Sequence, residues 1–181
     1  MTFSNLMIYL KADLSRLFID NPQLSSFRFL LKLFNPRFFP VLFLRLARYC
    51  YLNRFLFFIS PIFTWINVLI FGVEITPKCD IGPGLILPHA IGVIIGANKI
   101  GSNATIFQGV TIGATSLDIE FNPALRPVIG DNFIVGAGAK ILGGISIGNN
   151  VTVGANSVVI ESLPDSVVAV GLPAKIHKKL R

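Results

Sequence analysis

An aliphatic residue returns at every sixth position between residues 75 and 159. The series starts at Ile75, passes one single-residue insertion and one longer insertion, and ends at Val159. Such a repeat predicts stacked units, because one short unit cannot bury its apolar side chain alone. Six residues make a strand and a corner, so three hexads predict one turn of a triangular coil. Thirteen positions share the phase: Ile75, Ile81, Leu87, Ile94, Ile100, Ile106, Ile112, Ile129, Val135, Ile141, Ile147, Val153 and Val159.

The first 72 residues show a helical spacing of apolar residues instead. A helix is expected over residues 1 to about 20, a second over residues 25–34 and a third over residues 40–58, with Asn-Pro pairs ending the first two. Residues 55–73 form a run of nineteen residues without a charge, which is long enough to cross a bilayer. Pro61 and the polar side chains near it favour helices that lie at an interface over a membrane span.

Composition divides the chain at the same place. All sixteen glycines lie at or after Gly72, and eleven of the sixteen phenylalanines lie in residues 27–71. Residues 1–72 carry eight Lys and Arg against two acids, or +6, whereas residues 73–181 carry eight against seven, or +1. We therefore expect two parts, 1–72 and 73–181. The basic and aromatic first part fits either an anionic membrane surface or a helical cap packed on the coil and on neighbouring subunits.

Several classes of site and partner are not expected. Cys50 and Cys79 have neither metal-like nor disulfide-like spacing, which fits reduced thiols in a cytoplasmic chain. The first ten residues lack the basic start and cleavage site of a signal peptide. Nucleic acid is not expected as a partner, because Phe and Leu dilute the basic residues.

One long insertion interrupts the repeat between Ile112 and Ile129. It predicts a loop at about 114–126 that protrudes from the coil, where substrate contacts commonly form. A second feature follows from sorting the hexads by coil. The residues two places after one set of hexads line up along an edge: His89, Gln108, Ala137 and Ala155.

His89 is the only histidine within the repeat, because His177 lies in the charged C-terminal tail and is expected to be solvated. An imidazole titrates near neutral pH, so it can take a proton from a hydroxyl group. A purely structural histidine is the alternative at this stage. The column therefore predicts a general base above a groove floored by small residues.

Five motifs together resemble the serine O-acetyltransferase branch of the hexapeptide-repeat acyltransferases. They are Gly-Val-Glu-Ile at 72–75, Leu-Pro-His-Ala at 87–90, Phe-Gln-Gly-Val-Thr-Ile-Gly at 107–113, Gly-Ala-Gly-Ala-Lys-Ile-Leu-Gly at 136–143 and Gly-Leu-Pro-Ala-Lys at 171–175. The resemblance implies a mainly β fold, a left-handed parallel β-helix preceded by an α-helical N-terminal region. It also implies a homotrimer with sites between subunits, acetyl-CoA as co-substrate and no metal.

The resemblance assigns roles to individual residues. His89 would be the general base, and Glu74, where the family usually has Asp, would orient its ring. An acceptor hydroxyl would then attack the thioester directly, while fixed N–H donors stabilise the oxyanion. Four residues would lie along acetyl-CoA: Ala137, Gly138 and Ala155 beside the pantetheine arm, and Lys175 near the phosphates.

The acceptor is predicted from two departures from the family. Leu125 and Arg126 replace an Arg-His pair that helps to hold serine, and Pro88 replaces an acid beside the histidine. The apolar, basic N-terminal part also resembles serine-acetyltransferase-like enzymes of capsule and exopolysaccharide synthesis. We therefore expect an O-acetyltransferase that acts in the cytoplasm, at the inner face of the membrane, on a sugar of a surface polysaccharide or its precursor. Arg126 and Gln108 would contact this saccharide.

Two alternatives remain at this stage. The first is a serine O-acetyltransferase of cysteine biosynthesis, which turnover of free L-serine would favour. The second is a non-catalytic, membrane-associated solenoid scaffold, which would not bind acetyl-CoA.

Overall fold

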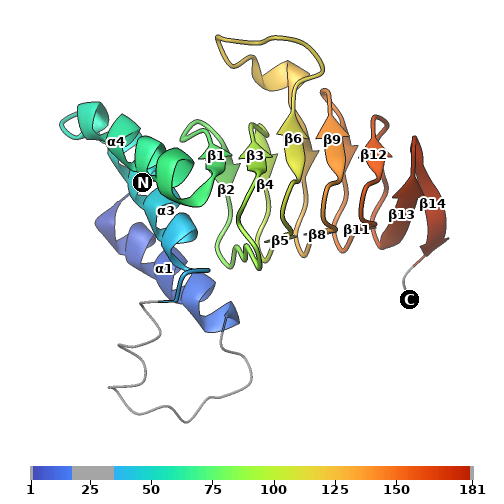
Figure 1. The fold of residues 1–181 in the computed structure, drawn as a ribbon, viewed down its shortest axis with the longest axis horizontal. Helices are drawn as coiled ribbons and strands as arrows, with labels where there is room; N and C mark the ends of the chain where they lie inside the picture. Colours follow the sequence, from blue (N-terminus) through green and yellow to red (C-terminus); the bar gives the residue numbers. More distant parts are fainter. Residues whose placement is uncertain (1, 18–34, 180–181) are drawn as a thin grey trace.

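The computed structural model describes residues 2–17 and 35–179, with helices packed at one end of a stack of short strands (Figure 1). The first expected helix is present and ends at Arg16, whereas the helix expected over 25–34 lies outside the described residues. The third begins at Phe39 but ends at Tyr51, because Asn53 forms a turn in which its side chain accepts from the Phe55 amide at 3.0 Å. The helical segments are α1 (Phe3–Arg16), α3 (Phe39–Tyr51), η1 (Phe57–Ile59), α4 (Ser60–Ile66), η2 (Asn67–Phe71) and η3 (Pro123–Leu125).

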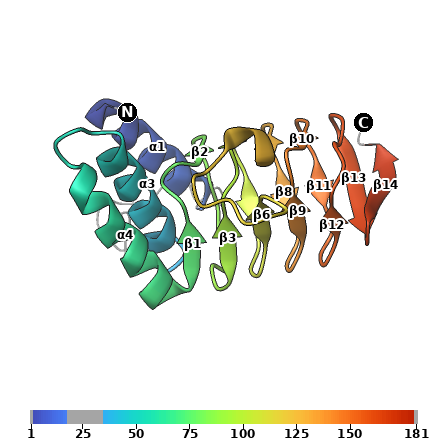
Figure 2. The same cartoon turned by 90° about the horizontal axis from the view of Figure 1, so that it is seen from above.

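From β1 to β13, consecutive strands belong to different sheets, so the chain winds from sheet to sheet as a coil (Figures 1 and 2). The first sheet contains β1 (Val73–Ile75), β3 (Val93–Ile95), β6 (Thr111–Gly113), β9 (Lys140–Leu142) and β12 (Val158–Val159). The second contains β2 (Asp80–Ile81), β4 (Lys99–Ile100), β7 (Val128–Ile129) and β10 (Ser146–Ile147). The third contains β5 (Thr105–Ile106), β8 (Ile134–Val135), β11 (Thr152–Val153), β13 (Val167–Gly171) and β14 (Ala174–Lys179).

All of these strand pairs are parallel except β13 with β14, which form an antiparallel closure at the C-terminal end. This hairpin was not expected, because His177 and the residues after it read as a charged tail. The parallel coil that the hexads predict is confirmed. Its left-handed sense stays a prediction.

The aliphatic hexads form buried columns inside the coil, with one error in the predicted phase. One column contains Ile75, Ile95, Ile112, Ile141 and Val159. Ile94, which the phase predicts to be buried, is 43% exposed, whereas Ile95 is 1% exposed. The prediction is wrong here because the chain inserts two residues after Leu87, not one, and then takes a five-residue step to Ile100.

Glycines and asparagines at the corners allow neighbouring coils to stack closely. A Cβ atom on Gly101 would lie 2.6 Å from the carbonyl carbon of Gly130, so only glycine fits there. Asn103, Asn132 and Asn150 have positive φ angles of 62°, 57° and 56°. Their side chains form a ladder, with N–O distances of 3.2 Å from Asn103 to Asn132 and 2.9 Å from Asn132 to Asn150.

Three arginines of the helical part hold it against the coil. Arg45 of α3 donates to the carbonyls of Ile81 and Gly82, and Arg48 donates to those of Pro77 and Lys78. Arg16 of α1 donates to the carbonyls of Gly84 and Ala104. Three of the cations that suggested a membrane surface therefore attach the helices to the coil as a cap (Figure 2). This is the second of the two interpretations that the sequence left open.

The apolar run at 55–73 does not form one helix. It is divided into η1, α4, η2 and the start of β1. Within residues 2–17 and 35–179, no helix combines the length and the apolar character that crossing a membrane requires.

Candidate active site

The protruding loop covers a hollow on the outer face of the first sheet. The hollow has a volume of about 490 Å³ and is lined by strands β1, β3 and β6 and by the loop. In β1 and β3 the central side chain points outward, because its neighbours on either side fill the core, whereas in β6 the central Ile112 is buried and Thr111 stands in the outward column. This outward column contains Glu74, Ile94, Thr111, Lys140 and Val158. The alternation of buried and exposed residues along the chain is the sequence signal that could have placed Thr111 in one column with Glu74, with Ile94 between them.

Arg126 anchors the loop over this hollow. Its guanidinium donates to the Asp118 carboxylate at 2.9 Å, to the Asp118 carbonyl at 2.9 Å and to the Gly96 carbonyl at 2.8 Å. It also lies 4.0 Å from the centre of the Phe121 ring, and its side chain is only 11% exposed. The sequence predicts a substrate contact for Arg126, whereas in the structure it joins the loop to the coil, so three of its five N–H donors are already engaged.

His89 lies in the two-residue insertion that shifts the repeat. The Gly109 amide donates to the Ile91 carbonyl at 3.1 Å, and the Gly138 amide donates to the Gln108 carbonyl at 2.9 Å. Ile91, and not His89, therefore stands in line with Gln108, which corrects the predicted column. The insertion turns His89 outward, where it is exposed beside Phe71 in a hollow of about 340 Å³.

Glu74 and His89 approach one corner of the coil from opposite sides. The Gly92 amide donates to the Gly72 carbonyl at 2.9 Å, so Glu74 follows this contact by two residues and His89 precedes it by three. Among the described residues the two side chains form no hydrogen bond or ion pair with each other, and they line different hollows. Their predicted pairing stays a prediction.

The predicted acetyl-CoA residues form a column of small groups along the same edge. Gly138 stacks on Gly109, which places Ala137 in line with Gln108, and the Asn156 amide donates to the Ala137 carbonyl at 2.8 Å, which brings Ala155 to the next level. The coils are closely spaced here, because a Cβ on Gly136 would lie 2.5 Å from the Ala155 nitrogen. Lys175 is exposed on β14, opposite Val170, at the C-terminal end of the stack. These roles along the cofactor stay predictions.

Lys140, which the sequence analysis does not single out, stands near this edge. Its ammonium donates to the Gly109 carbonyl at 2.6 Å and so bridges two coils. The sequence does not distinguish Lys140 from a surface lysine, because a single lysine on a strand carries no distinctive spacing.

Known proteins resemble the chain over nearly all of its length. The bacterial transferase hexapeptide family (six repeats) matches residues 126–161. A serine acetyltransferase of Helicobacter pylori strain J99 is 38% identical over 176 residues, which are 97% of this chain and 100% of that protein. This chain belongs to the serine acetyltransferase family of hexapeptide-repeat transferases. As a member, it is an acetyl-CoA-dependent acyltransferase, which excludes the non-catalytic scaffold.

Solved structures of serine acetyltransferases have the same architecture. The Neisseria gonorrhoeae enzyme in complex with serine has a TM-score of 0.79 and 32% identity, covering 95% of this chain and 69% of that one. A serine acetyltransferase in complex with CoA has a TM-score of 0.80 and 27% identity, covering 96% and 70%.

These relatives overturn the predicted acceptor. The expectation of a polysaccharide O-acetyltransferase is wrong, because the relatives that match the whole chain are serine acetyltransferases. The H. pylori match includes the helical part, whose apolar and basic composition had favoured a glycan enzyme. The composition gave a wrong indication of the acceptor, because three arginines of the helical part bind the coil and attach the cap to it.

Proposed function

We propose that this protein transfers an acetyl group from acetyl-CoA to the hydroxyl of L-serine and so forms O-acetyl-L-serine. The observation that carries the proposal is the 38% identity to a serine acetyltransferase across that protein's entire length. The hollow at Glu74 also suits a zwitterion, since it is lined by acids and by the cations Lys78 and Arg126. We place the activity in the cytoplasm, where acetyl-CoA is available.

His89 is the proposed general base of this reaction. A ring nitrogen takes the hydroxyl proton of serine while the serine oxygen attacks the carbonyl carbon of the thioester. The C–S bond then breaks, and the imidazolium returns the proton to the sulfur of CoA. The exposure of His89 outside the regular coil leaves its ring accessible to both substrates. Glu74 would act on His89 as a positioning residue that stabilises the imidazolium.

The site is proposed to be completed between subunits of a homotrimer, as the family resemblance implies. In a single chain the described residues leave Glu74 and His89 unpaired with each other and their hollows open to solvent. A neighbouring subunit would close the space over His89, with acetyl-CoA lying along Ala137, Gly138 and Ala155. Closure would also exclude water, which otherwise hydrolyses the thioester.

Lys78 is the cation that we assign to the carboxylate of serine. Arg126 and Leu125 replace the family's Arg-His pair, and the three hydrogen bonds of Arg126 tie the loop residue Asp118 to Gly96 of the coil. Lys78 is exposed and borders the same hollow, and its ammonium donates to the Glu120 carbonyl at 3.2 Å. One contact of this kind leaves two N–H groups of the ammonium for a substrate carboxylate.

The chain's two histidines provide a matched test. Purified protein is mixed with acetyl-CoA and L-serine, and the release of CoA is measured. We expect His89→Gln to lower kcat by about 10²- to 10⁴-fold, the usual contribution of a positioned general base. His177→Gln, an exposed histidine on β14, should retain the wild-type rate. A wild-type rate in His89→Gln would refute the assigned role.

A further inference from the structure

Helix α4 and the start of η2 face polar side chains inward, while α4 faces apolar side chains outward. Ser60 and Asn67 are 2% and 3% exposed, and they donate to the carbonyls of Ala47 and Pro40 of the neighbouring segment. On the opposite side, Ile62 is 56% exposed and Trp65 is 61% exposed. This arrangement is the reverse of a helix that faces water, because exposed apolar surface costs about 25 cal/mol per Å².

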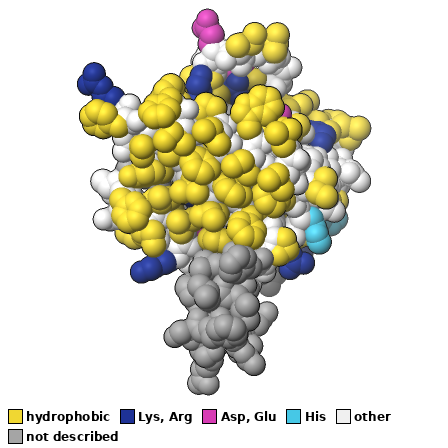
Figure 3. Space-filling view, turned by 60° about the vertical axis from the view of Figure 1, so that its left-hand side comes forward, with side chains coloured by type: hydrophobic (Ala, Val, Ile, Leu, Met, Phe, Trp, Pro, Cys, Tyr) yellow, Lys and Arg dark blue, Asp and Glu magenta, His cyan; other side chains and the backbone are white. Residues whose placement is uncertain are grey.

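The apolar surface extends beyond α4. Figure 3 shows hydrophobic side chains covering most of one side of the molecule, over the helical region. We call this surface the helical face. It contains the exposed side chains of Phe3, Ile8, Phe55, Phe57, Phe58, Ile62, Trp65, Leu69 and Ile70. An exposed apolar surface of this extent marks a site of interaction.

The exposed charges of the helical region are positive. Lys11, Arg37 and Arg54 are exposed, and Figure 3 shows Lys and Arg side chains around the margin of the helical face. Asp13 is the only acid among residues 2–17 and 35–72, and it is buried against Arg45. A surface that combines aromatic and aliphatic side chains with cations matches the interface of an anionic bilayer.

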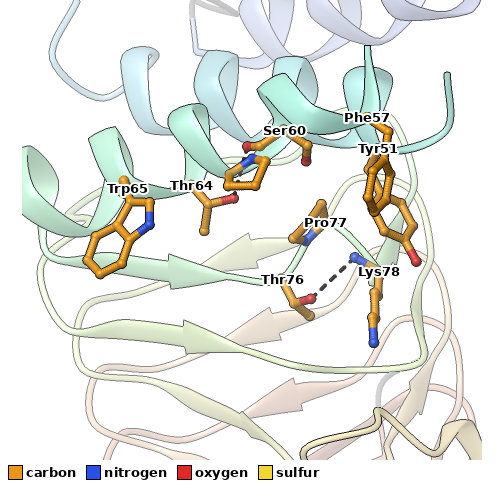
Figure 4. A pocket seen from close by; sticks show the side chains of 9 residues that line it. Tyr51, Phe57, Ser60, Thr64, Trp65, Thr76, Pro77 and Lys78 are labelled. Carbon is orange, nitrogen blue, oxygen red and sulfur yellow. Dashed lines mark hydrogen bonds between the residues drawn. The ribbon is translucent and has the colours of Figure 1, made fainter. Parts of the chain in front are cut away.

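A hollow beside α4 adds to the apolar character of this surface. It has a volume of about 310 Å³, and Figure 4 shows Tyr51, Phe57 and Trp65 around it, together with Pro77 and Lys78 of the first coil. The hydroxyls of Ser60 and Thr64 donate to backbone carbonyls, so they do not offer free donors to the hollow. Hydrocarbon is therefore a better occupant than a polar ligand.

We propose that the helical face binds the surface of an anionic phospholipid bilayer and holds the enzyme there peripherally. A second copy of the chain fits less well, because pairing two such faces would bring cations together with no described acid between them. The helical face borders the reaction site, because Ile70 also lines the hollow of His89 and Lys78 lines both the hollow beside α4 and that of Glu74. The proposal nevertheless names a bilayer as the partner and does not rest on which acceptor the enzyme uses. Each basic side chain near a bilayer surface strengthens binding about fivefold, so three predict an anionic preference on the order of a hundredfold.

Trp65 gives a direct probe, because it is the chain's single tryptophan. The full-length protein is titrated with vesicles of phosphatidylcholine, alone or with phosphatidylglycerol, while its emission spectrum and its flotation with vesicles are measured. We expect a blue shift and flotation with the anionic vesicles, weakened by salt. The double variant Phe55→Ser/Phe58→Ser removes two exposed rings of 82% and 73% exposure and should lose this binding. The control Ile160→Ser, at a 50% exposed residue of the last coil, should bind like the wild type.

Two results would overturn the proposal. One is an emission spectrum and flotation that anionic vesicles leave unchanged. The other is a blue shift that depends on protein concentration without vesicles and that accompanies doubling of the mass, which would assign the face to a second copy. Serine-dependent CoA release in the same preparation separates either failure from a failure of the proposed reaction.

Discussion

The carboxylate of Asp13 accepts two hydrogen bonds from Arg45, at 2.8 Å from Nε and 3.0 Å from Nη2, and both side chains are almost fully buried. Asp13 also accepts from the amides of Gly84 and Leu85, at 2.7 Å and 2.8 Å. This one ion pair therefore joins α1, α3 and the first coil. It closes the N-terminal end of the β-helix, where the core of the first coil would otherwise meet water.

Replacing Asp13 should destabilise the fold strongly. In Asp13→Ala the guanidinium of Arg45 and two backbone amides lose their buried acceptor, which costs about 3–5 kcal/mol. Urea unfolding followed by circular dichroism measures this loss. Lys11→Ala, an exposed change on the same helix, should stay within about 0.5 kcal/mol of the wild type. Equal stabilities for the two variants would show that the ion pair does not hold the cap.

The asparagine ladder should depend on backbone conformation at Asn132. Its φ angle of 57° is unfavourable for a β-branched side chain, so Asn132→Val should lose about 1–2 kcal/mol from backbone strain in addition to the ladder hydrogen bonds. Asn132→Gly loses the same hydrogen bonds without this strain. Thermal unfolding of both variants compares them, and a glycine variant that is no more stable than the valine variant would contradict the assigned cause.

The stability should fall at alkaline pH because of Cys79. Burial raises the pKa of the Cys79 thiol from 9.0 to about 12. Between these values the unfolded chain loses the proton while the folded chain keeps it, so the free energy of unfolding decreases as pH rises, by about 1.4 kcal/mol per pH unit. We would compare the unfolding midpoints of the wild type and Cys79→Ala between pH 8 and pH 11 to measure this pH dependence of stability. The two curves should converge as pH rises, and parallel curves would refute the linkage.

Lys78 should affect serine and not acetyl-CoA. Loss of one charge-assisted contact in Lys78→Met should raise the KM for L-serine roughly 10- to 100-fold, corresponding to about 1.5–3 kcal/mol. The KM for acetyl-CoA should stay unchanged. Lys99→Met, an exposed lysine on β4 in another sheet, is the matched control. An unchanged KM for serine in Lys78→Met would show that another residue binds the carboxylate of serine.

The repeat predicted the coil well because burial leaves few choices for an aliphatic residue at every sixth position. The error at Ile94 arises where Val93, Ile94 and Ile95 are all aliphatic, so the sequence does not indicate which side faces inward. The register fixes it, since Val93 and Ile95 pair with the inward residues of β1. The insertion that causes the shift also turns His89 outward.

The contacts that hold the helical cap and the protruding loop in place could not be predicted from the sequence. Arg45 and Arg48 read as surface charges, because a sequence does not show that their guanidinium groups reach backbone carbonyls of a later segment. Arg126 gives the same difficulty, since its partners Asp118 and Gly96 lie on different segments. The acceptor was predicted wrongly for a related reason. The basic composition of the helical part was interpreted without knowledge of the contacts that its arginines make with the coil.

The measurement that tests the central claim most directly is the product formed from acetyl-CoA and L-serine. Purified wild-type protein is incubated with both substrates, and mass spectrometry quantifies O-acetyl-L-serine beside the CoA released. We predict equal amounts of the two products, and neither above background in His89→Gln. CoA release without O-acetyl-L-serine, or no release with serine by a folded protein that binds acetyl-CoA, would contradict the account.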